Sequence, residues 1–423
     1  MGFTLSRVLP EIHLCHNLAD AARDALSHDV AELLDGQGMP HARDLPLLRP
    51  LLACWTRCQA FGKASRRACW NENAQTQYNW LVRNALLLSL GDGRQPLAED
   101  APAWDLQLLA AALELGGDDD DEDIAGLALP PALTRRSKRI VAKLPAPGLN
   151  SEWSEIAVLR TAWRRGGPML TVDYSAEQIK AELTCGGETI LRGDWQAEIR
   201  VNGRLATPDD DWECVCWESD ADVDYLELEL DLTENVRVQR QFLLARDDLF
   251  LFVADAVLGA EPADIEYRLA LPLAEGVSHL GGKETWDARL KGRRRCATVL
   301  PLAIDEWRRA GRAGSFDMGP SGLEYVLRTD RASLYAPLFF DLNPRRQRHE
   351  PTWRRLTVAD TRVIQPPDVA VGYRVQVGQR QWLFYRSLAE TASRTVLGVN
   401  LTHEFLAARF GKDGVGEELL EIE

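Results

Sequence analysis

The chain has 423 residues, of which 45% are hydrophobic and 27% charged; this composition is typical of a globular protein with two or three domains and excludes disordered and fibrous classes. The formal net charge of −15 disfavours nucleic acid and anionic membranes as general partners, because both would repel the chain at long range. No segment approaches the roughly 20 apolar residues of a membrane span, and the N-terminus lacks the apolar run of a secretory signal. We therefore expect a cytoplasmic protein.

Residues 1–129 are predicted to form a helical domain. Apolar residues recur at helical spacing in residues 18–35, 45–61, 74–90 and 104–115, and each segment ends at or near a glycine. The acidic run 118–123 is interpreted as a solvated loop or a helix start, because calcium loops need alternating ligands and a turn glycine. Residues 130–150 combine prolines with basic residues, which predicts a linker.

Residues 151–423 are predicted to form an antiparallel β-sandwich domain. Residues 212–259 alternate apolar and polar residues, turn at 233–235, alternate again, turn at 246–248, and run into a continuous apolar block at 249–254. Alternation is typical of strands with one wet face, and a short apolar block is typical of a strand covered on both faces. Asn202-Gly203 predicts a two-residue hairpin turn. Further strand patterns fall within 265–273, 296–304, 323–327, 334–342, 369–377 and 381–388.

Arg240 interrupts the apolar face of the central hairpins. It alternates in phase with Leu228, Val238 and Phe242, so its side chain is expected on the same face as theirs. Because a buried, unpaired charge is costly, Arg240 either pairs with a carboxylate of a facing strand or lines a cleft as a free cation. The second interpretation makes Arg240 a catalytic candidate.

A cluster of amide and aromatic side chains begins the third helical segment. It includes Asn73, Gln77, Tyr78 and Trp80. Sugar sites are commonly lined in this way, since rings stack on pyranose faces and amides bond hydroxyl groups. In this interpretation Tyr78 transfers a proton and the other three bind substrate; helix capping with a core tryptophan is the alternative.

A basic and aromatic patch lies nearer the C-terminus. Its members are Arg345, Arg346, Arg348, Trp353, Arg354 and Arg355. Guanidinium groups recognise carboxylates by bidentate pairing, so we expect Trp353 and Arg354 to bind substrate; a surface loop paired with the acidic excess is the alternative. The eight cysteines and seven histidines show no metal-ligand spacing. We therefore predict neither a metal nor another cofactor.

Two stretches of the β region resemble the heparinase II/III-like polysaccharide lyases. Residues 151–191, with VLRTAW at 158–163, are similar to the entry into the β domain of that family. Residues 236–273 are similar to its later passage, in which a cross-strand arginine precedes further strands. The resemblance implies an α+β fold class: an N-terminal helical region, as a bundle or partial toroid, packed on a large antiparallel β super-sandwich.

The resemblance also implies chemistry on acidic glycans. In that family a Tyr or His removes the C5 proton of a uronate, while a neutral or cationic group masks the carboxylate. By residue type, Tyr78 is the candidate for proton transfer and Arg160 or Arg240 for the carboxylate clamp, with Trp163 beside Arg160 as a further substrate-binding residue. The family's histidine-rich motif is expected near 172–183, where this chain reads VDYSAEQIKAEL and has no histidine.

Three functional hypotheses follow. The first is a carbohydrate-interacting protein without the standard catalytic histidines, which the 13 tryptophans favour. The second is an active polysaccharide lyase or other glycan-degrading enzyme, with Tyr78, His13 or His16 and a β-domain arginine in one cleft. The third is a non-catalytic scaffold protein with an exposed apolar patch. The expected partner is a glycan, either neutral or held in a locally basic groove; the sequence carries no signal for an oligomeric state.

Overall fold

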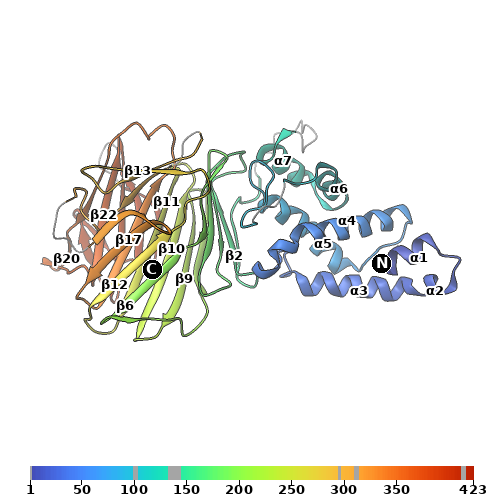
Figure 1. Ribbon diagram of the computed structural model, residues 1–423, viewed down its shortest axis with the longest axis horizontal. Helices are drawn as coiled ribbons and strands as arrows, with labels where there is room; N and C mark the ends of the chain where they lie inside the picture. The colour runs from blue at the N-terminus through green and yellow to red at the C-terminus, as the bar shows by residue number, and fades with distance from the viewer. Residues whose placement is uncertain (1, 99–102, 132–143, 294–296, 309–313, 411–415) are drawn as a thin grey trace. The chain divides into compact units, whose positions relative to one another are not determined.

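The computed structural model describes residues 2–98, 103–131, 144–293, 297–308, 314–410 and 416–423. The chain divides into two compact units, Met1–Val158 with Ala162–Gly167 and Leu159–Thr161 with Pro168–Glu423. The first contains the helices and the second most of the strands (Figure 1). The α+β class is therefore confirmed. The linker predicted over 130–150 falls largely on residues 132–143, which lie outside the described residues.

The helical unit follows the apolar periodicity of the sequence. Its helices are α1 (Gly2–Val8), α2 (His13–His16), α3 (Leu18–Leu33), the 3₁₀ helix η1 (Ala42–Leu47), α4 (Leu48–Ala64), α5 (Glu72–Leu87), α6 (Leu106–Gly116) and α7 (Asp119–Ala128). Pro50 lies in the first turn of α4, where a missing N–H is tolerated. No helix in the described part of the chain combines the length and the apolar character that crossing a membrane requires.

The acidic run at 118–123 begins helix α7. The side chain of Asp118 accepts a hydrogen bond from the backbone N–H of Asp121 at 2.9 Å, and the side chain of Asp121 accepts one from the backbone N–H of Asp118 at 3.1 Å. This reciprocal capping box satisfies two of the free N–H groups at the helix start. Carboxylates also interact favourably with the positive end of the helix dipole. Of the two interpretations of this run, the helix start is the one that the structure shows.

The β unit is built from antiparallel sheets. The central sheet has eight strands, in the order β13 (Ser278–Gly281), β14 (Ala288–Lys291), β15 (Ala297–Pro301), β18 (Ser333–Asp341), β11 (Phe250–Gly259), β10 (Val236–Ala245), β9 (Val223–Leu232) and β8 (Glu213–Ser219). The β12 sheet has five, in the order β16 (Gly314–Gly319), β17 (Gly322–Thr329), β12 (Ile265–Leu271), β6 (Gln196–Val201) and β7 (Arg204–Leu205).

Two further sheets belong to the C-terminal part. The C-terminal sheet has the order β19 (Pro351–Leu356), β22 (Ala370–Val377), β23 (Arg380–Ser387), β26 (Phe405–Phe410) and β27 (Gly416–Ile422), and the small sheet has the order β21 (Val363–Ile364), β20 (Val358–Asp360), β24 (Arg394–Val396) and β25 (Val399–Leu401). The remaining strands are the hairpin β1 (Leu149–Ser151) and β2 (Ile156–Arg160) and the meander β3 (Met169–Asp173), β4 (Lys180–Cys185) and β5 (Glu188–Asp194).

The central hairpins have the turns that the sequence predicts. Strands β9 and β10 are joined by 233–235, with Glu234 and Asn235 in the left-handed region. Strands β6 and β7 are joined by Asn202-Gly203, both with positive φ. A turn with two such residues matches the right-handed twist of the paired strands, which explains the preference for Asn-Gly.

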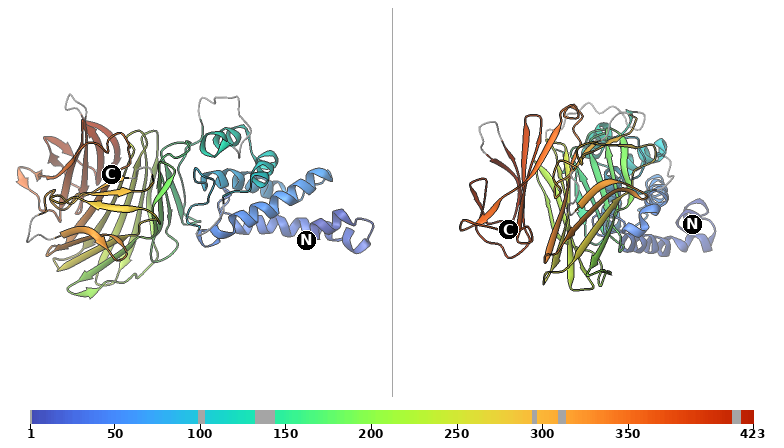
Figure 2. Two further views of the ribbon diagram at one scale, coloured as in Figure 1. Left: turned by 45° about the horizontal axis from the view of Figure 1, so that its top comes forward. Right: turned by 60° about the vertical axis from the view of Figure 1, so that its left-hand side comes forward.

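Burial on both faces explains the continuous apolar block of β11. On one face of the central sheet, Phe250 and Phe252 pack against the C-terminal sheet, with Phe252 stacked on Phe384 at a centroid distance of 4.4 Å. On the other face, Leu251 and Val253 are also buried. Each such side chain contributes about 1.5–3 kcal/mol by leaving water. In the right-hand view of Figure 2 the C-terminal strands, orange to red, form a separate layer beside the green and yellow strands.

Candidate functional site

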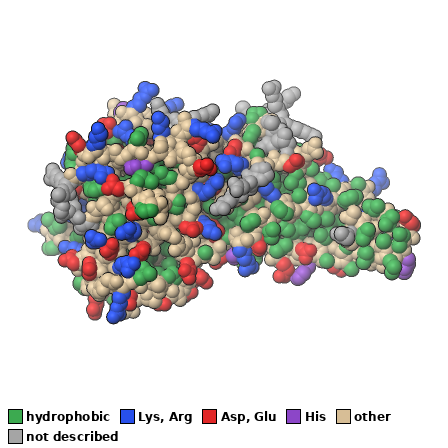
Figure 3. Space-filling view, viewed as in Figure 1, with side chains coloured by type: hydrophobic (Ala, Val, Ile, Leu, Met, Phe, Trp, Pro, Cys, Tyr) green, Lys and Arg blue, Asp and Glu red, His purple; other side chains and the backbone are tan. Residues whose placement is uncertain are grey.

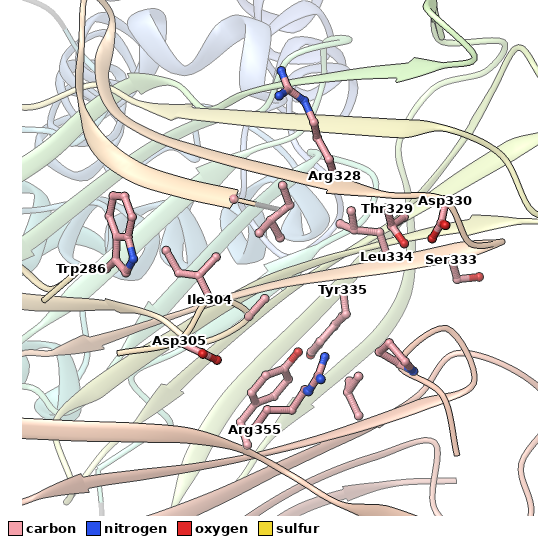
Figure 4. A pocket seen from close by; sticks show the side chains of 16 residues that line it. Trp286, Ile304, Asp305, Arg328, Thr329, Asp330, Ser333, Leu334, Tyr335 and Arg355 are labelled. Carbon is pink, nitrogen blue, oxygen red and sulfur yellow. The ribbon is translucent and has the colours of Figure 1, made fainter. Parts of the chain in front are cut away.

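A pocket of about 390 Å³ opens in the β unit between the central and C-terminal sheets. The end of β17, the start of β18 and the loop after β15 form one wall, and β19 and β22 form the other. The lining residues used below, several of them shown in Figure 4, are Trp286, Thr329, Ser333, Tyr335, Arg355 and Tyr373. The carboxylates of Asp305 and Asp330 also line the pocket. The pocket therefore combines three aromatic rings with charged and hydroxyl groups.

Strand alternation places Arg355 in this pocket. In the register of β19 and β22, Arg355 lies directly opposite Tyr373, and Arg354 lies directly opposite Arg374. Successive side chains of a strand point to opposite faces, so Arg355 and Tyr373 face the central sheet while Arg354 and Arg374 face away from it. In Figure 4 the Arg355 side chain extends into the pocket toward Tyr335. Among the described residues, Arg355 has no carboxylate within ion-pair distance.

The two phenols of the pocket are neutral at physiological pH. Burial raises the pKa of Tyr335 well above its ordinary value. Burial also raises the pKa of Tyr373, and the opposing effect of the Arg355 cation is smaller. A group with a strongly raised pKa is a poor general base near neutral pH. These hydroxyls are therefore suited to hydrogen bonding rather than to abstracting a proton.

Trp286 forms the end of the pocket. The guanidinium carbon of Arg308 lies 4.2 Å from the centroid of its ring, a cation–π distance. Its backbone N–H donates to the carbonyl of Glu306 at 3.1 Å and fixes the loop. The indole N–H is buried and has no hydrogen-bond partner among the described residues.

Tyr335 connects the pocket to a buried polar network. Its hydroxyl donates to Gln241 Oε1 at 2.6 Å, and Gln241 Nε2 donates to the hydroxyl of Tyr225 at 2.6 Å. The Tyr225 hydroxyl in turn bonds Glu227, whose carboxylate pairs with Arg386 at 2.8 Å. Because each polar group in this series forms a hydrogen bond with the next one, the network holds the Tyr335 ring in one position.

Arg240 is paired rather than free. Its guanidinium makes two hydrogen bonds of 2.7 Å to Asp255, its neighbour across β10 and β11, and one of 3.0 Å to the carbonyl of Trp195. Tyr267 donates to the same carboxylate at 2.7 Å. Burial opposes the charge of Arg240, but Asp255 outweighs it and raises the pKa. Of the two interpretations, the structure shows the pair with a facing strand, although Arg240 and Trp212 also line a pocket of about 280 Å³.

Arg160 belongs to a second buried cluster. Its side chain is 3% exposed, and burial lowers its pKa to about 10. Its backbone N–H donates to Asp224 at 2.8 Å, and Asp224 pairs with Arg246 at 2.6 Å. The Arg160 carbonyl also accepts from Arg246 at 3.3 Å, so the Arg160 backbone is part of a buried polar cluster. Trp163 is likewise buried, and its indole donates to the carbonyl of Pro145 at 2.8 Å within the helical unit.

The candidates in helix α5 divide between its buried and exposed faces. Tyr78 is fully buried, its hydroxyl lies 3.0 Å from that of Thr56, and burial raises its pKa to about 12. Gln77 is buried and bonds the backbone of Gly36 and Gly38. Asn73 is exposed, and Trp80 is 43% exposed beneath the guanidinium of Arg83 at 5.4 Å. The helix therefore does not present the four side chains on one surface.

The basic and aromatic patch near the C-terminus also divides. Trp353 is 2% exposed, and its indole donates to the carbonyl of Ile304 at 2.9 Å. Arg346 is buried against Asp341 at 2.7 Å, whereas Arg354 and Arg355 are exposed. Trp353 and Arg354 border a separate pocket of about 220 Å³. No group of three or more His, Cys, Asp or Glu side chains within the described ranges is arranged to hold a metal ion.

Comparison with solved structures identifies the architecture. Heparinase III, the BT4657 gene product with methylated lysines, matches with a TM-score of 0.68 and 9% identity over 92% of this chain and 64% of that one. Heparan sulfate lyase HepC from Pedobacter heparinus matches with a TM-score of 0.63 and 11% identity over 90% and 64% of the two chains. This chain has the fold of heparinase III. The resemblance carried by residues 151–191 and 236–273 is thus confirmed for the fold.

The chain is a divergent version of the heparinase III fold. It spans 64% of the length of the two structures named above. No protein-family model matches the sequence, and no curated protein matches it. At 9–11% identity the shared fold does not transfer residue roles, so function has to be inferred from this chain's own side chains.

Proposed function

We propose that this protein binds a carbohydrate through the pocket between its central and C-terminal sheets. The observation that carries the proposal is Arg355, an exposed cation without a carboxylate partner in the described structure, which shares its pocket with the neutral phenols Tyr335 and Tyr373 and the indole of Trp286. Carbohydrate sites combine flat apolar rings with a few placed polar groups in this way. The heparinase III fold provides a lyase-like scaffold for such a site.

The ligand that fits best carries a carboxylate. A guanidinium binds a carboxylate through two parallel hydrogen bonds, and Arg355 is exposed and has no carboxylate within 4 Å among the described residues. The hydroxyls of Ser333, Thr329 and Tyr373 are suited to sugar hydroxyls around it. Since the chain carries a net charge of −15, an acidic glycan needs such a local cation to offset the repulsion at long range.

Binding is proposed without proton abstraction at this pocket. Burial raises the pKa of Tyr335 and Tyr373, so neither hydroxyl is suited to act as the base at neutral pH. The absence of histidine from 172–183 is in keeping with a protein that uses the scaffold for recognition. We accordingly propose a carbohydrate-interacting protein without the standard catalytic histidines.

The test is calorimetric titration with a panel of neutral, uronic and heparan-type oligosaccharides, the last because one structural relative is a heparan sulfate lyase. We expect an acidic glycan to bind, and Arg355→Ala to weaken that binding at least about tenfold, the loss of a charge-assisted hydrogen-bond pair. Arg268→Ala is the matched control: it removes another exposed arginine, on β12, outside this pocket. Equal affinities for wild type and Arg355→Ala would overturn the assignment of the pocket.

The lyase-like fold favours glycan cleavage as a second function. Cleavage by elimination leaves an unsaturated sugar whose ultraviolet absorbance can be followed continuously. We would incubate the protein with the uronic members of the same panel. A rise in absorbance that persists in Arg355→Ala would indicate an enzyme with its chemistry outside the proposed pocket, and no rise with any substrate leaves binding as the function.

A further inference from the structure

Two arginines face each other on the outer face of the C-terminal sheet. Arg354 of β19 and Arg374 of β22 are direct cross-strand neighbours, and with Thr352, Gln376 and Trp353 they line a pocket of about 220 Å³. The small sheet covers the other end of this face, where Ala370, Leu383 and Tyr385 are buried. The arginine end of the face is open, and we call it the outer pocket.

Like charges directly opposite each other destabilise a strand pair. Elsewhere in the β unit, Arg240, Arg346 and Arg386 each pair with a buried carboxylate at 2.7–2.8 Å. Two acidic pairs have the same cross-strand arrangement, Glu213 with Glu229 and Asp317 with Glu324. Arginines offset their charge: Arg237 lies 3.0 Å from Glu229, Arg308 2.8 Å from Asp317 and Arg268 3.5 Å from Glu324. On the face shown in Figure 3, the basic side chains of the β unit are interspersed with acidic ones. Within the described residues, the facing arginines Arg354 and Arg374 lack such a compensating neighbour in their pocket.

In the part of the chain that the structure describes, no Asp or Glu lines the outer pocket. Among the described residues, neither Arg354 nor Arg374 has a carboxylate within 4 Å, although Arg354 acts at longer range on the partly buried Glu306. Arg354 is exposed and Arg374 half-buried, so both guanidinium groups remain accessible from solvent.

One of the two arginines is held in place by its neighbours. Arg374 Nη2 donates to Gln376 Oε1 at 2.8 Å, and Gln376 Nε2 donates to the carbonyl of Gly378 at 3.1 Å. A fixed guanidinium loses less conformational entropy when it binds an anion. Thr352, opposite Gln376 in the register, adds a hydroxyl donor on the same face.

We propose that the outer pocket is an oxyanion-binding site that takes a sulfate, phosphate or carboxylate group between Arg354 and Arg374. Guanidinium groups bind such oxyanions through paired N–H donors. The site is separate from the glycan pocket, because Arg354 and Arg355 leave opposite faces of the same strand. The proposal does not depend on the proposed function.

The test compares the unfolding temperatures of wild type and variants in chloride and in sulfate. Because the two cations repel each other, Arg354→Gln and Arg374→Gln should unfold at the same temperature as wild type or higher in chloride buffer. In sulfate of equal ionic strength wild type should gain stability, and both variants should lose the part of that gain due to binding. Sulfate also stabilises proteins by exclusion from their surface, so the quantity compared is the gain of wild type minus that of each outer variant. The control Arg268→Gln keeps the outer pocket and should show the same gain as wild type.

Arg355→Gln shows which face of the C-terminal sheet binds the sulfate. We expect it to keep the full sulfate gain, and the two outer variants to weaken sulfate binding measured by calorimetry at least about tenfold. Arg354→Lys keeps the positive charge but loses the paired N–H donors of the guanidinium, so its sulfate affinity should lie between those of wild type and Arg354→Gln. An unchanged gain in Arg354→Gln and Arg374→Gln overturns the proposal, as does a gain lost only in Arg355→Gln.

The source of the oxyanion is separated by a second titration. A sulfated oligosaccharide, its desulfated form and inorganic sulfate are each titrated against wild type and Arg354→Gln. Arg354-dependent binding of the sulfated oligosaccharide beyond that of inorganic sulfate identifies a group carried on a glycan. Arg354-dependent binding of inorganic sulfate alone identifies a free ion, and Arg354-independent binding of all three contradicts the site.

Discussion

Arg240 and Arg354 were both candidates for binding an anionic substrate, and their surroundings are opposite. Arg240 lies on an interior strand of the eight-stranded sheet with Asp255, Tyr267 and the carbonyl of Trp195 around it. Arg354 lies on an outer strand, exposed, and faces a second arginine. A buried arginine has to be paired with a carboxylate of the protein because its desolvation is costly. An exposed arginine stays hydrated, needs no such partner and can bind a ligand. The same residue type is therefore structural at one position and available at the other.

Alkaline pH should cause the largest loss of stability, because it ionises many buried groups at once, whereas exposed groups such as Arg354 are little affected. Burial raises the pKa of Tyr78, Tyr225, Tyr267, Tyr325, Tyr335 and Tyr373. A raised folded-state pKa means that the stabilisation is fully present below the ordinary value of 10 and is lost as the pH rises through the folded-state value. We expect urea midpoints that are constant to about pH 9 and fall steeply above pH 10.

Tyrosinate absorbance gives the check on that expectation. The buried phenols should ionise over the same pH range in which the tryptophan emission changes to that of the unfolded chain, because both changes occur as the sheets unfold. Stepwise ionisation at ordinary pKa values, in a chain that stays folded, would show that the interior between the sheets is open to water.

Asp255→Ala should have the next largest effect. It leaves the charge of Arg240 buried and unpaired and removes the acceptor of Tyr267, so we expect a loss of about 3–5 kcal/mol in the free energy of unfolding. Glu198→Ala breaks the exposed pair with Arg200 at 2.8 Å and should lose under about 1 kcal/mol. Urea denaturation of both variants makes the comparison, and similar losses would contradict the structural role assigned to Arg240.

Gln241→Leu tests the network behind the glycan pocket. Gln241 bonds the hydroxyls of Tyr225 and Tyr335, and its loss leaves two buried phenols without that partner. We expect a loss of about 1–3 kcal/mol in the free energy of unfolding, together with weaker glycan binding because Tyr335 is no longer held. A destabilised variant with unchanged glycan affinity would separate the network from the pocket.

Patterns of period two predicted most of the β unit, because burial on one or both faces acts on every strand residue. The turns at 233–235 and Asn202-Gly203, the strand at 249–254 and the in-phase position of Arg240 all followed from alternation. The α+β class followed from the contrast between helical and alternating segments.

The glycan pocket was harder to predict, because it joins residues that are distant in the sequence. Trp286, Tyr335 and Tyr373 come from three separate segments, and each reads as an ordinary core aromatic. The signal that was present is the alternation in the segment TWRRL, which places Arg354 and Arg355 on opposite faces of the strand. Grouping these two arginines as one patch missed that they line two different pockets. In helix α5, the amides and rings of 73–80 were grouped in the same way, although capping and core packing separate them.

The smallest effect on stability is expected for Arg355→Ala. The side chain is exposed and, within the described structure, pairs with no carboxylate, so its removal should change the free energy of unfolding by less than about 0.5 kcal/mol. Glycan affinity, in contrast, should fall at least about tenfold. This separation of binding from folding is what distinguishes a ligand-facing arginine from Arg240. Urea denaturation and calorimetry on the same preparation measure both quantities, and a loss of several kcal/mol would mean that Arg355 supports the fold in the manner of the buried arginines.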